Sequence, residues 1–200
     1  MLTATYTLVA LSVEQTKVRV SLQSLHKFLQ SNLLHRSSLS RGQVECVCDT
    51  LKRLYEAYHW RKLDKFLIPA VRRASTAAAE LLGELEALSQ TAAEAMAAAV
   101  RSAGGAALEG EARVARFCAL IDRFCAALLE RLEREEHELF PVARAVIPSE
   151  TWFAIANQML AHDAYHMESR GGQAYGGARR AFRGPVDHTM RQGSPLTIAH

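Results

Sequence analysis

The chain has 200 residues, 49% of them hydrophobic, and a formal net charge of +3 at pH 7. This length allows one domain with a sizeable core, and the interspersed charges do not indicate nucleic-acid binding. An apolar run of about 18 residues, which would predict a membrane span, does not occur. Residues 1–10 lack the basic start and the cleavage site of a signal peptide. We therefore expect a cytoplasmic protein that binds neither nucleic acid nor membrane.

The first predicted helix runs from Ser12 to about Leu34. Ser12 and Gln15 have the spacing of a capping box, which marks a helix start. Behind them, residues at alternating intervals of three and four form an inward stripe: Leu11, Gln15, Val18, Leu22, Leu25 and Leu29. Gln15 is the one polar residue on this stripe.

A second capping box, Ser40 to Gln43, begins a helix predicted to continue to about Arg73. Pro69 has no amide proton, so we expect it to break or kink the last turns. The inward stripe of this helix is Val44, Cys48, Leu51, Tyr55, His59, Leu63 and Phe66. The pattern predicts that His59 faces the core.

Two further long helices follow. The third is predicted from Thr76 to Arg101 and ends before Gly104 and Gly105; its inward row is Leu82, Leu85, Ser89, Ala92 and Met96. The fourth is predicted from Glu111 to Val146, with the stripe Phe117, Ile121, Phe124, Leu128, Arg131, Glu135 and Leu139. Charged residues thus occupy two neighbouring core-facing positions of the fourth helix.

The C-terminal part changes in character. A short fifth helix is predicted over residues 150–162, carrying Trp152, Phe153, Ile155 and Met159, and no strand is expected anywhere. Residues 163–200 are rich in glycine and have no apolar period, which predicts a flexible tail. We divide the chain into a helical domain, 1–165, and a Gly/Arg-rich, disordered tail, 166–200. Its arginines form a basic cluster that an acidic protein partner would fit: Arg179, Arg180, Arg183 and Arg191.

Two segments of the chain are similar to one another. His59–Arg72 and Arg131–Arg144 each place a polar residue ten positions before a proline, Pro69 or Pro141, and end on an arginine. Such an internal repeat in a helical chain predicts a bundle with pseudo-twofold symmetry. The four cysteines, Cys46, Cys48, Cys118 and Cys125, lack Cys-x-x-Cys spacing, which favours free thiols over a metal cluster.

Six inward positions, one or two on each of four helices, fall in one polar cross-section of the otherwise apolar core: Gln15, His59, Leu63, Ser89, Arg131 and Glu135. Four-helix bundles hold metals and cofactors through histidine and carboxylate side chains on facing helices. The positions match such a site, whereas the residue types match it only in part.

Residues 8–165 resemble the hemerythrin-like, or HHE cation-binding, family. The resemblance lies in Glu135-Glu-His-Glu-Leu-Phe-Pro141 with Pro148–Trp152 after it, and in Tyr58–Asp64 followed by Pro69. It implies an antiparallel up-down four-helix bundle, which typically holds a non-haem di-iron centre. Members bind or sense oxygen, handle nitric oxide or peroxide, or serve iron–sulfur repair.

The ligand positions implied by this resemblance are largely substituted. Gln15, Leu63, Ser89 and Arg131 stand where the family has ligands, and His59 and Glu135 alone match. Leucine has no lone pair, and a guanidinium is a fixed cation that repels a metal ion. Our hypothesis is that Arg131 replaces the metal as the positive charge beside Glu135, with Gln15, Ser89 and His59 completing a hydrogen-bonded plug.

Two functions follow. The preferred one is a scaffold that has lost its di-iron centre and binds a protein partner or regulates it, with a homodimer as one form that it can take. The alternative is a reduced iron site built on His59 and Glu135, with help from Asp64, His137, Glu14 or water. Metal-free catalysis has no support, because neither a Ser-His-Asp nor a Cys-His arrangement is legible.

Overall fold

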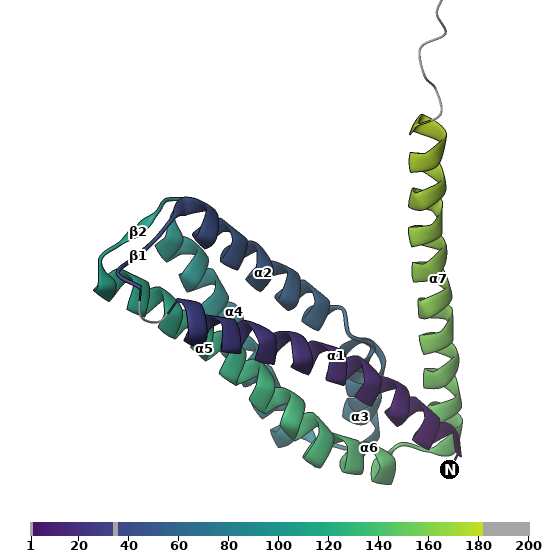
Figure 1. The fold of residues 1–200 in the computed structure, drawn as a ribbon. Helices are drawn as coiled ribbons and strands as arrows, with labels where there is room; N and C mark the ends of the chain where they lie inside the picture. Colours follow the sequence, from purple (N-terminus) through teal and green to yellow (C-terminus); the bar gives the residue numbers. More distant parts are fainter. Residues whose placement is uncertain (1, 34–35, 182–200) are drawn as a thin grey trace, which may run out of the picture. The chain divides into compact units, whose positions relative to one another are not determined.

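The computed structural model describes residues 2–33 and 36–181, with side chains through Tyr165. The long helices are α1 (Leu2–Asn32), α2 (Arg41–His59), α4 (Ala79–Ala103), α5 (Glu111–Arg134) and α7 (Ser149–Ala181). Shorter helical segments connect them: the π-helical turns η1 (Leu63–Leu67) and η2 (Glu135–Leu139), and the α-helices α3 (Ile68–Ala74) and α6 (Phe140–Val146). The described chain is mostly helical, as the sequence predicts (Figure 1).

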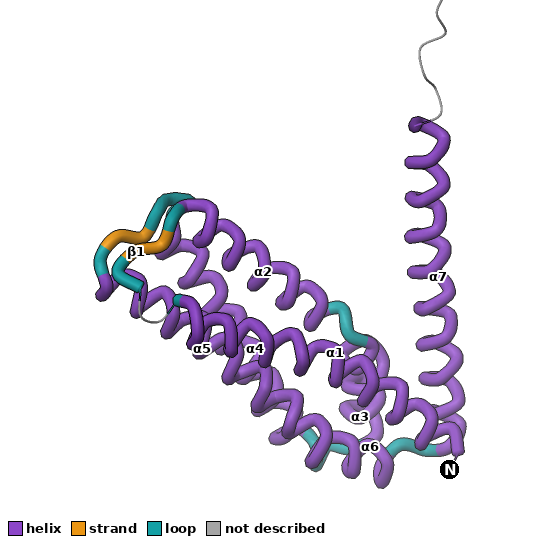
Figure 2. The backbone as a smooth tube through the Cα atoms, in the orientation of Figure 1, coloured by secondary structure: helices purple, strands orange, loops and turns teal. Residues whose placement is uncertain are grey.

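Two strands of two residues each also occur, which the sequence did not predict. β1 (Ser38–Leu39) pairs antiparallel with β2 (Leu108–Glu109), so the loop after α1 is held to the loop before α5 (Figure 2). Leu39 and Leu108 are both buried. Strands this short carry no periodicity from which they could have been predicted.

Helices α1, α2, α4 and α5 form a ring of contacts, in which α5 packs along α4 and α1, and α2 packs along the same two helices. The buried stripes of α1 and α5 agree closely with the predicted ones, whereas those of α2 and α4 agree in part. All six predicted positions on α1 and all seven on α5 and η2 are buried. Gly104 ends α4 with a φ of 55°, a left-handed conformation that glycine adopts without strain.

The apolar core consists of two clusters. The first joins the second half of α1 and the second half of α4 to nearly the whole lengths of α2 and α5, and includes Leu22, Leu51 and Phe124. The second joins the other end of α1 to η1, α3, α6 and the first turns of α7, and includes Leu11, Leu139 and Trp152. The side chains between the two clusters are polar.

The first helix begins ten residues before the predicted start. Ser12 and Gln15 are not a cap, because α1 starts at Leu2 and the Ser12 carbonyl accepts a hydrogen bond from Thr16 within the helix. The extra turns bury Ala4, Thr7 and Leu8, which continue the predicted stripe. The capping box at Ser40 is confirmed. The backbone N–H of Gln43 donates to Ser40 Oγ, and the backbone N–H of Ser40 donates to Gln43 Oε1.

The second predicted helix is interrupted earlier than expected. It ends at His59, and Trp60 and Arg61 separate it from η1 and α3. Pro69 lies in the first turn of α3, directly after η1, and Pro141 lies in the first turn of α6, directly after η2. The two segments with similar sequences therefore share a π-helical turn followed by a proline.

The chain divides into two compact units, residues 1–159 and 160–200. In the first, Trp152, Ile155 and Met159 of α7 are buried, whereas Phe153 is exposed. In the second, α7 continues to Ala181, beyond the predicted end near His162; glycines, each about 1 kcal/mol less favourable than alanine in a helix, had argued against this extension. Residues 182–200 of the predicted tail lie outside the described part. No helix in the described ranges is long and apolar enough to cross a membrane.

Candidate functional site: a buried polar layer

A layer of polar side chains separates the two apolar clusters. On each helix it falls where one cluster ends and the other begins: Gln15 lies between Leu11 and Val18, and Ser89 lies between Leu85 and Ala92. Its buried members are Gln15, Tyr58, Arg61, Arg131 and Glu135. We call Gln15, Tyr58, Arg61, Asp64, Ser89, Arg131 and Glu135 the polar layer.

Glu135 lies at the centre of the polar layer and is fully buried. Arg61 binds its carboxylate through two parallel hydrogen bonds of 2.7 Å, from Nη1 to Oε2 and from Nη2 to Oε1. Gln15 Nε2 donates a third bond of 2.6 Å to Oε2. Such a bidentate pair is among the strongest charge-assisted contacts in proteins, and both carboxylate oxygens are used in it.

Arg131 is the second cation of the polar layer. Its Nε lies 3.0 Å from Glu135 Oε1, an ion-pair contact without hydrogen-bond geometry. Its two terminal nitrogens donate to Ser89 Oγ and to Asp64 Oδ1. Asp64 also accepts a 3.2 Å bond from Arg61 Nη2, so it bridges the two arginines. Two guanidinium groups and two carboxylates leave the layer without net charge.

Tyr58 packs against both cations. The Arg61 guanidinium lies 4.1 Å from the centre of the Tyr58 ring, and that of Arg131 lies 5.2 Å from it. These distances are within the range of cation–π attraction. Burial raises the pKa of Tyr58 above its ordinary value, so the phenol stays neutral. Burial lowers the pKa of Arg61, but the charge and hydrogen bonds of Glu135 raise it by more. The pKa of Arg61 is therefore above its ordinary value, and Arg61 stays charged.

A cavity of about 480 Å³ opens onto the Arg131 side of the polar layer. Its lining combines residues of the layer with residues of α2, α3 and α4: Tyr55, Tyr58, His59, Asp64, Ile68, Pro69, Arg72, Arg73, Glu86, Ser89, Gln90 and Arg131. The Arg61–Glu135 pair does not line this cavity. The centre of the layer is therefore closed to a ligand that enters from this side.

The structure brings together four of the six predicted positions in the polar layer. Gln15 and Glu135 are buried in contact with one another, and Arg131 and Ser89 join them as predicted. Leu63 is buried but lies in the second apolar cluster.

The prediction that His59 faces the core is wrong, because its side chain is exposed and stacks on Tyr55. With about 100° per residue, His59 lies about 80° around the helix from Leu51, whereas Tyr58 lies only about 20° from it. Tyr58 therefore takes the inward place.

Sequence reasoning missed Arg61, the principal partner of Glu135. α2 ends at His59, and the break at Trp60 changes the helical phase, so that a residue which a continuous helix would expose turns inward. One signal was present: Arg61 precedes Asp64 by three residues, the spacing of an ion pair on one helical turn. Asp64, which the sequence offered as a helper of an iron site, is part-buried between two arginines.

The donor set does not fit an iron centre. Iron needs neutral imidazoles and anionic carboxylates with free lone pairs. Both oxygens of Glu135 accept hydrogen bonds from Arg61 or Gln15, and the guanidinium groups cannot lose a proton. Among the described side chains, no three His, Cys, Asp or Glu residues gather as a metal-binding group.

The other candidate ligands lie elsewhere. His137 is exposed and contacts the Glu133 carbonyl at 2.9 Å, and Glu14 accepts a bond from the Lys62 amide. Two further histidines, His26 and His35, were not expected to be ligands: His26 pairs with Asp122 at 2.7 Å, and His35 lies outside the described residues. Cys48, Cys118 and Cys125 are buried free thiols as predicted, whereas Cys46 is exposed.

Comparison with known proteins gives no further identification. No family model matches the chain, and no curated protein or solved structure matches it significantly. The resemblance to hemerythrin-like proteins therefore depends on the residues and motifs given above.

Proposed function

We propose that this protein is a divergent hemerythrin-like four-helix bundle in which protein cations replace the di-iron centre, and that it acts as a non-catalytic scaffold that binds or regulates a partner. The observation that carries this proposal is the bidentate contact of Arg61 with the fully buried Glu135. An isolated buried carboxylate is strongly destabilising, and a metal ion or a fixed cation can compensate for it.

The arrangement of the polar layer supports this reading. Gln15, Ser89, Arg131 and Glu135 come from α1, α4, α5 and η2, which is how bundle proteins distribute ligands over their helices. Every charge in the layer has an opposite charge within contact distance. A layer of this kind orients helices, and its central pair, Arg61 and Glu135, does not line the 480 Å³ cavity.

Metal analysis tests the proposal directly. Protein purified without an affinity tag and then supplied with ferrous iron should retain far less than one iron per chain. Its melting temperature should be the same with iron and with a chelator, because no coordination sphere stabilises the folded state. About two irons per chain, an oxo-bridge band in the visible spectrum, or a melting temperature several degrees higher with iron would contradict it.

An arginine variant serves as the matched control. Removing a guanidinium while keeping the carboxylates, as in Arg61→Ala, creates the anionic pocket that a cation needs. If this variant takes up iron and the wild type does not, then Arg61 is the group that stands in the metal's place. Iron uptake by the wild type but not by the variant would contradict the proposal that Arg61 replaces the metal.

A further inference from the structure

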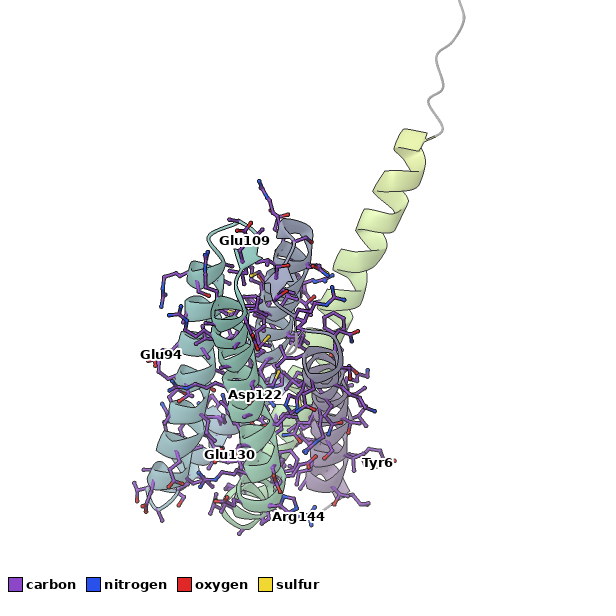
Figure 3. All side chains as sticks on the ribbon, turned by 60° about the vertical axis from the view of Figure 1, so that its left-hand side comes forward. Tyr6, Glu94, Glu109, Asp122, Glu130 and Arg144 are labelled. Carbon is purple, nitrogen blue, oxygen red and sulfur yellow. The ribbon has the colours of Figure 1, made fainter. Side chains whose placement is uncertain are left out.

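Helix α1 is apolar on its outer face as well as on its buried face. Its residues 2–13 include no charged side chain. Leu2 is 79% exposed and Tyr6 76%, and Val9, Val13 and Val20 are 56%, 53% and 55% exposed. Figure 3 shows Tyr6 extending away from the helix into solvent. Large apolar side chains that gather in one exposed patch mark a surface for interaction.

The exposed residues follow a heptad pattern. Leu2, Tyr6, Val9, Val13 and Val20 lie within about 60° of one another around the helix axis, as do the a and d positions of a coiled coil. Thr16 fills the place between Val13 and Val20, and its hydroxyl donates to the Ser12 carbonyl at 2.8 Å, so it brings no unsatisfied donor. We call Leu2, Tyr6, Val9, Val13, Thr16 and Val20 the outer stripe.

We propose that the outer stripe of α1 is the interface of a homodimer in which two copies of α1 pack antiparallel. The stripe is nearly palindromic about residue 11, so antiparallel pairing sets Leu2 against Val20, Tyr6 against Thr16, and Val9 against Val13 of the second copy. Every apolar side chain on the stripe then meets the stripe of the other copy. This self-complementarity is what a twofold interface requires.

Charge favours the antiparallel arrangement over the parallel one. The exposed lysines of α1, Lys17 and Lys27, both lie in its second half. Parallel pairing would gather the lysines of both copies at one end of the interface. Antiparallel pairing separates them, sets each Lys17 beside the uncharged first turns of the other copy, and opposes the two helix dipoles.

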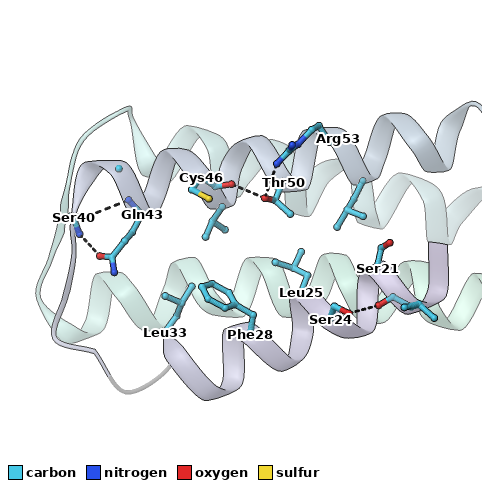
Figure 4. A pocket seen from close by; sticks show the side chains of 14 residues that line it. Ser21, Ser24, Leu25, Phe28, Leu33, Ser40, Gln43, Cys46, Thr50 and Arg53 are labelled. Carbon is cyan, nitrogen blue, oxygen red and sulfur yellow. Dashed lines mark hydrogen bonds between the residues drawn. The ribbon is translucent and has the colours of Figure 1, made fainter. Parts of the chain in front are cut away.

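The area is adequate for a stable dimer. Covering the exposed parts of the five apolar side chains would bury on the order of 600 Å² on each copy, near the ~800 Å² of a standard interface. The apolar surface also continues past Val20 into a groove of about 920 Å³ between α1 and α2, where Leu25, Phe28 and Val47 form the walls (Figure 4). Antiparallel pairing brings the first turn of the second copy to Val20, at the mouth of this groove.

The proposal deepens the scaffold function by naming one partner, and it depends on the outer stripe rather than on the polar layer. Iron in the bundle would overturn the proposed function without affecting the dimer. A monomeric wild type would refute the dimer, whereas the proposed function, which depends on the absence of iron from the polar layer, would stand.

Sedimentation velocity of the full chain tests the interface. The wild type should sediment at twice the chain mass of 22.1 kDa. The double variant Val9→Glu with Val13→Glu should weaken association at least about 100-fold and sediment as one chain, because it buries four like charges in the dimer. Phe153→Glu, which changes another exposed apolar residue, should leave the dimer intact. A monomeric wild type or a dimeric double variant would refute the interface, including the case in which residues 160–200 or another protein cover the stripe.

Disulfide cross-linking tests the direction of pairing without adding charge. In a Cys46→Ser background, Val9→Cys and Val13→Cys variants should each remain uncross-linked alone under oxidation, and should form a covalent dimer when mixed. Cross-linking of each variant with itself would show parallel pairing and contradict the proposal. Failure of the mixture to cross-link would likewise contradict it.

Discussion

Arg61 and Arg131 both contact Glu135, but they do so unequally. Arg61 makes two hydrogen bonds of 2.7 Å to a carboxylate that is shielded from water. Arg131 makes one ion-pair contact to it and directs its other nitrogens to Ser89 and to Asp64, which is partly exposed. Loss of Arg61 therefore leaves a buried charge with little compensation, whereas loss of Arg131 leaves Asp64 with access to water.

We expect Arg61→Met to destabilise the fold by about 3–5 kcal/mol, as removal of one partner of a buried pair does elsewhere. Arg131→Met should destabilise it by a smaller amount, about 1–3 kcal/mol. Urea unfolding followed by circular dichroism measures both free energies. As a control, Arg41→Ala removes an exposed ion pair with Glu45 and should leave the midpoint unchanged. A larger loss for Arg131 than for Arg61 would mean that Arg131 is the principal counter-charge, as the sequence alone had indicated.

The cysteines differ in reactivity according to burial. Burial raises the pKa of Cys125 to about 12 and also raises the pKa of Cys48 and Cys118, so these thiols are protonated near neutral pH. Cys46 is exposed. Because the thiolate is the reactive form, a disulfide reagent at pH 8 should titrate one thiol per folded chain rapidly and four after unfolding. Rapid reaction of Cys125 in the folded chain would contradict its position in the core.

The raised pKa of Cys125 also affects stability at high pH. The folded state keeps this thiol protonated up to about pH 12, whereas its ordinary pKa is 9.0. The contribution of this thiol to the free energy of unfolding is therefore fully present below pH 9. It is lost as the pH rises toward 12, because Cys125 ionises first in the unfolded chain. Replacing Cys125 with alanine should make the loss of stability between pH 9 and pH 12 less steep. An unchanged slope would contradict this linkage.

At the scale of the elements, two copies of the capping-box pattern have different structures. Ser12–Gln15 and Ser40–Gln43 both have capping-box spacing, yet only the second is a helix start. Local pattern cannot separate them, because Ala4, Thr7 and Leu8 extend the buried stripe of α1 past Ser12. Burial of those residues decides the outcome, and burial depends on the elements of the second apolar cluster.

A pair of alanine variants follows from this difference. Ser40→Ala should destabilise the fold by about 1 kcal/mol, because it removes the acceptor for the Gln43 amide at the start of α2. Ser12→Ala should be neutral or stabilising by a few tenths of a kcal/mol, because alanine is the better residue inside a helix. Thermal unfolding measures both. Equal losses would mean that α1 has a functional cap at Ser12 after all.

The helices and their inward faces are largely predictable from the sequence, whereas the centre of the site is not. Leu22, Phe124 and Leu128 follow simple periodicity, and Gln15, Arg131 and Glu135 stand out as polar residues within it. Arg61 and Tyr58 depend on a change of helical phase at Trp60. A break of this kind is set by tertiary packing around Leu63 and Leu67, which no local pattern records.

At the scale of the whole molecule, the polar layer lies between two apolar clusters that would otherwise be one core. Replacing a buried ion pair with apolar side chains of similar size is often neutral or stabilising, because desolvation of the charges offsets their attraction. The layer therefore contributes less to stability than to the choice of one arrangement among the helices. Gln15, Arg61, Ser89 and Arg131 each have a single set of partners, whereas leucines at the same places would accept several registers.

A fully apolar layer tests this division of roles. The variant that combines Arg61→Met, Asp64→Leu, Arg131→Met and Glu135→Leu removes two positive and two negative charges together, so it leaves no buried charge alone. We expect its free energy of unfolding to equal that of the wild type or to exceed it by about 1–4 kcal/mol, while its NMR signals broaden because the helices exchange between registers. Sharp, dispersed spectra with raised stability would mean that the layer does not specify the arrangement of helices. A loss of several kcal/mol would mean that the charges themselves hold the helices together. The greater effect of Arg61→Met than of Arg131→Met would then measure attraction rather than the desolvation of a stranded partner.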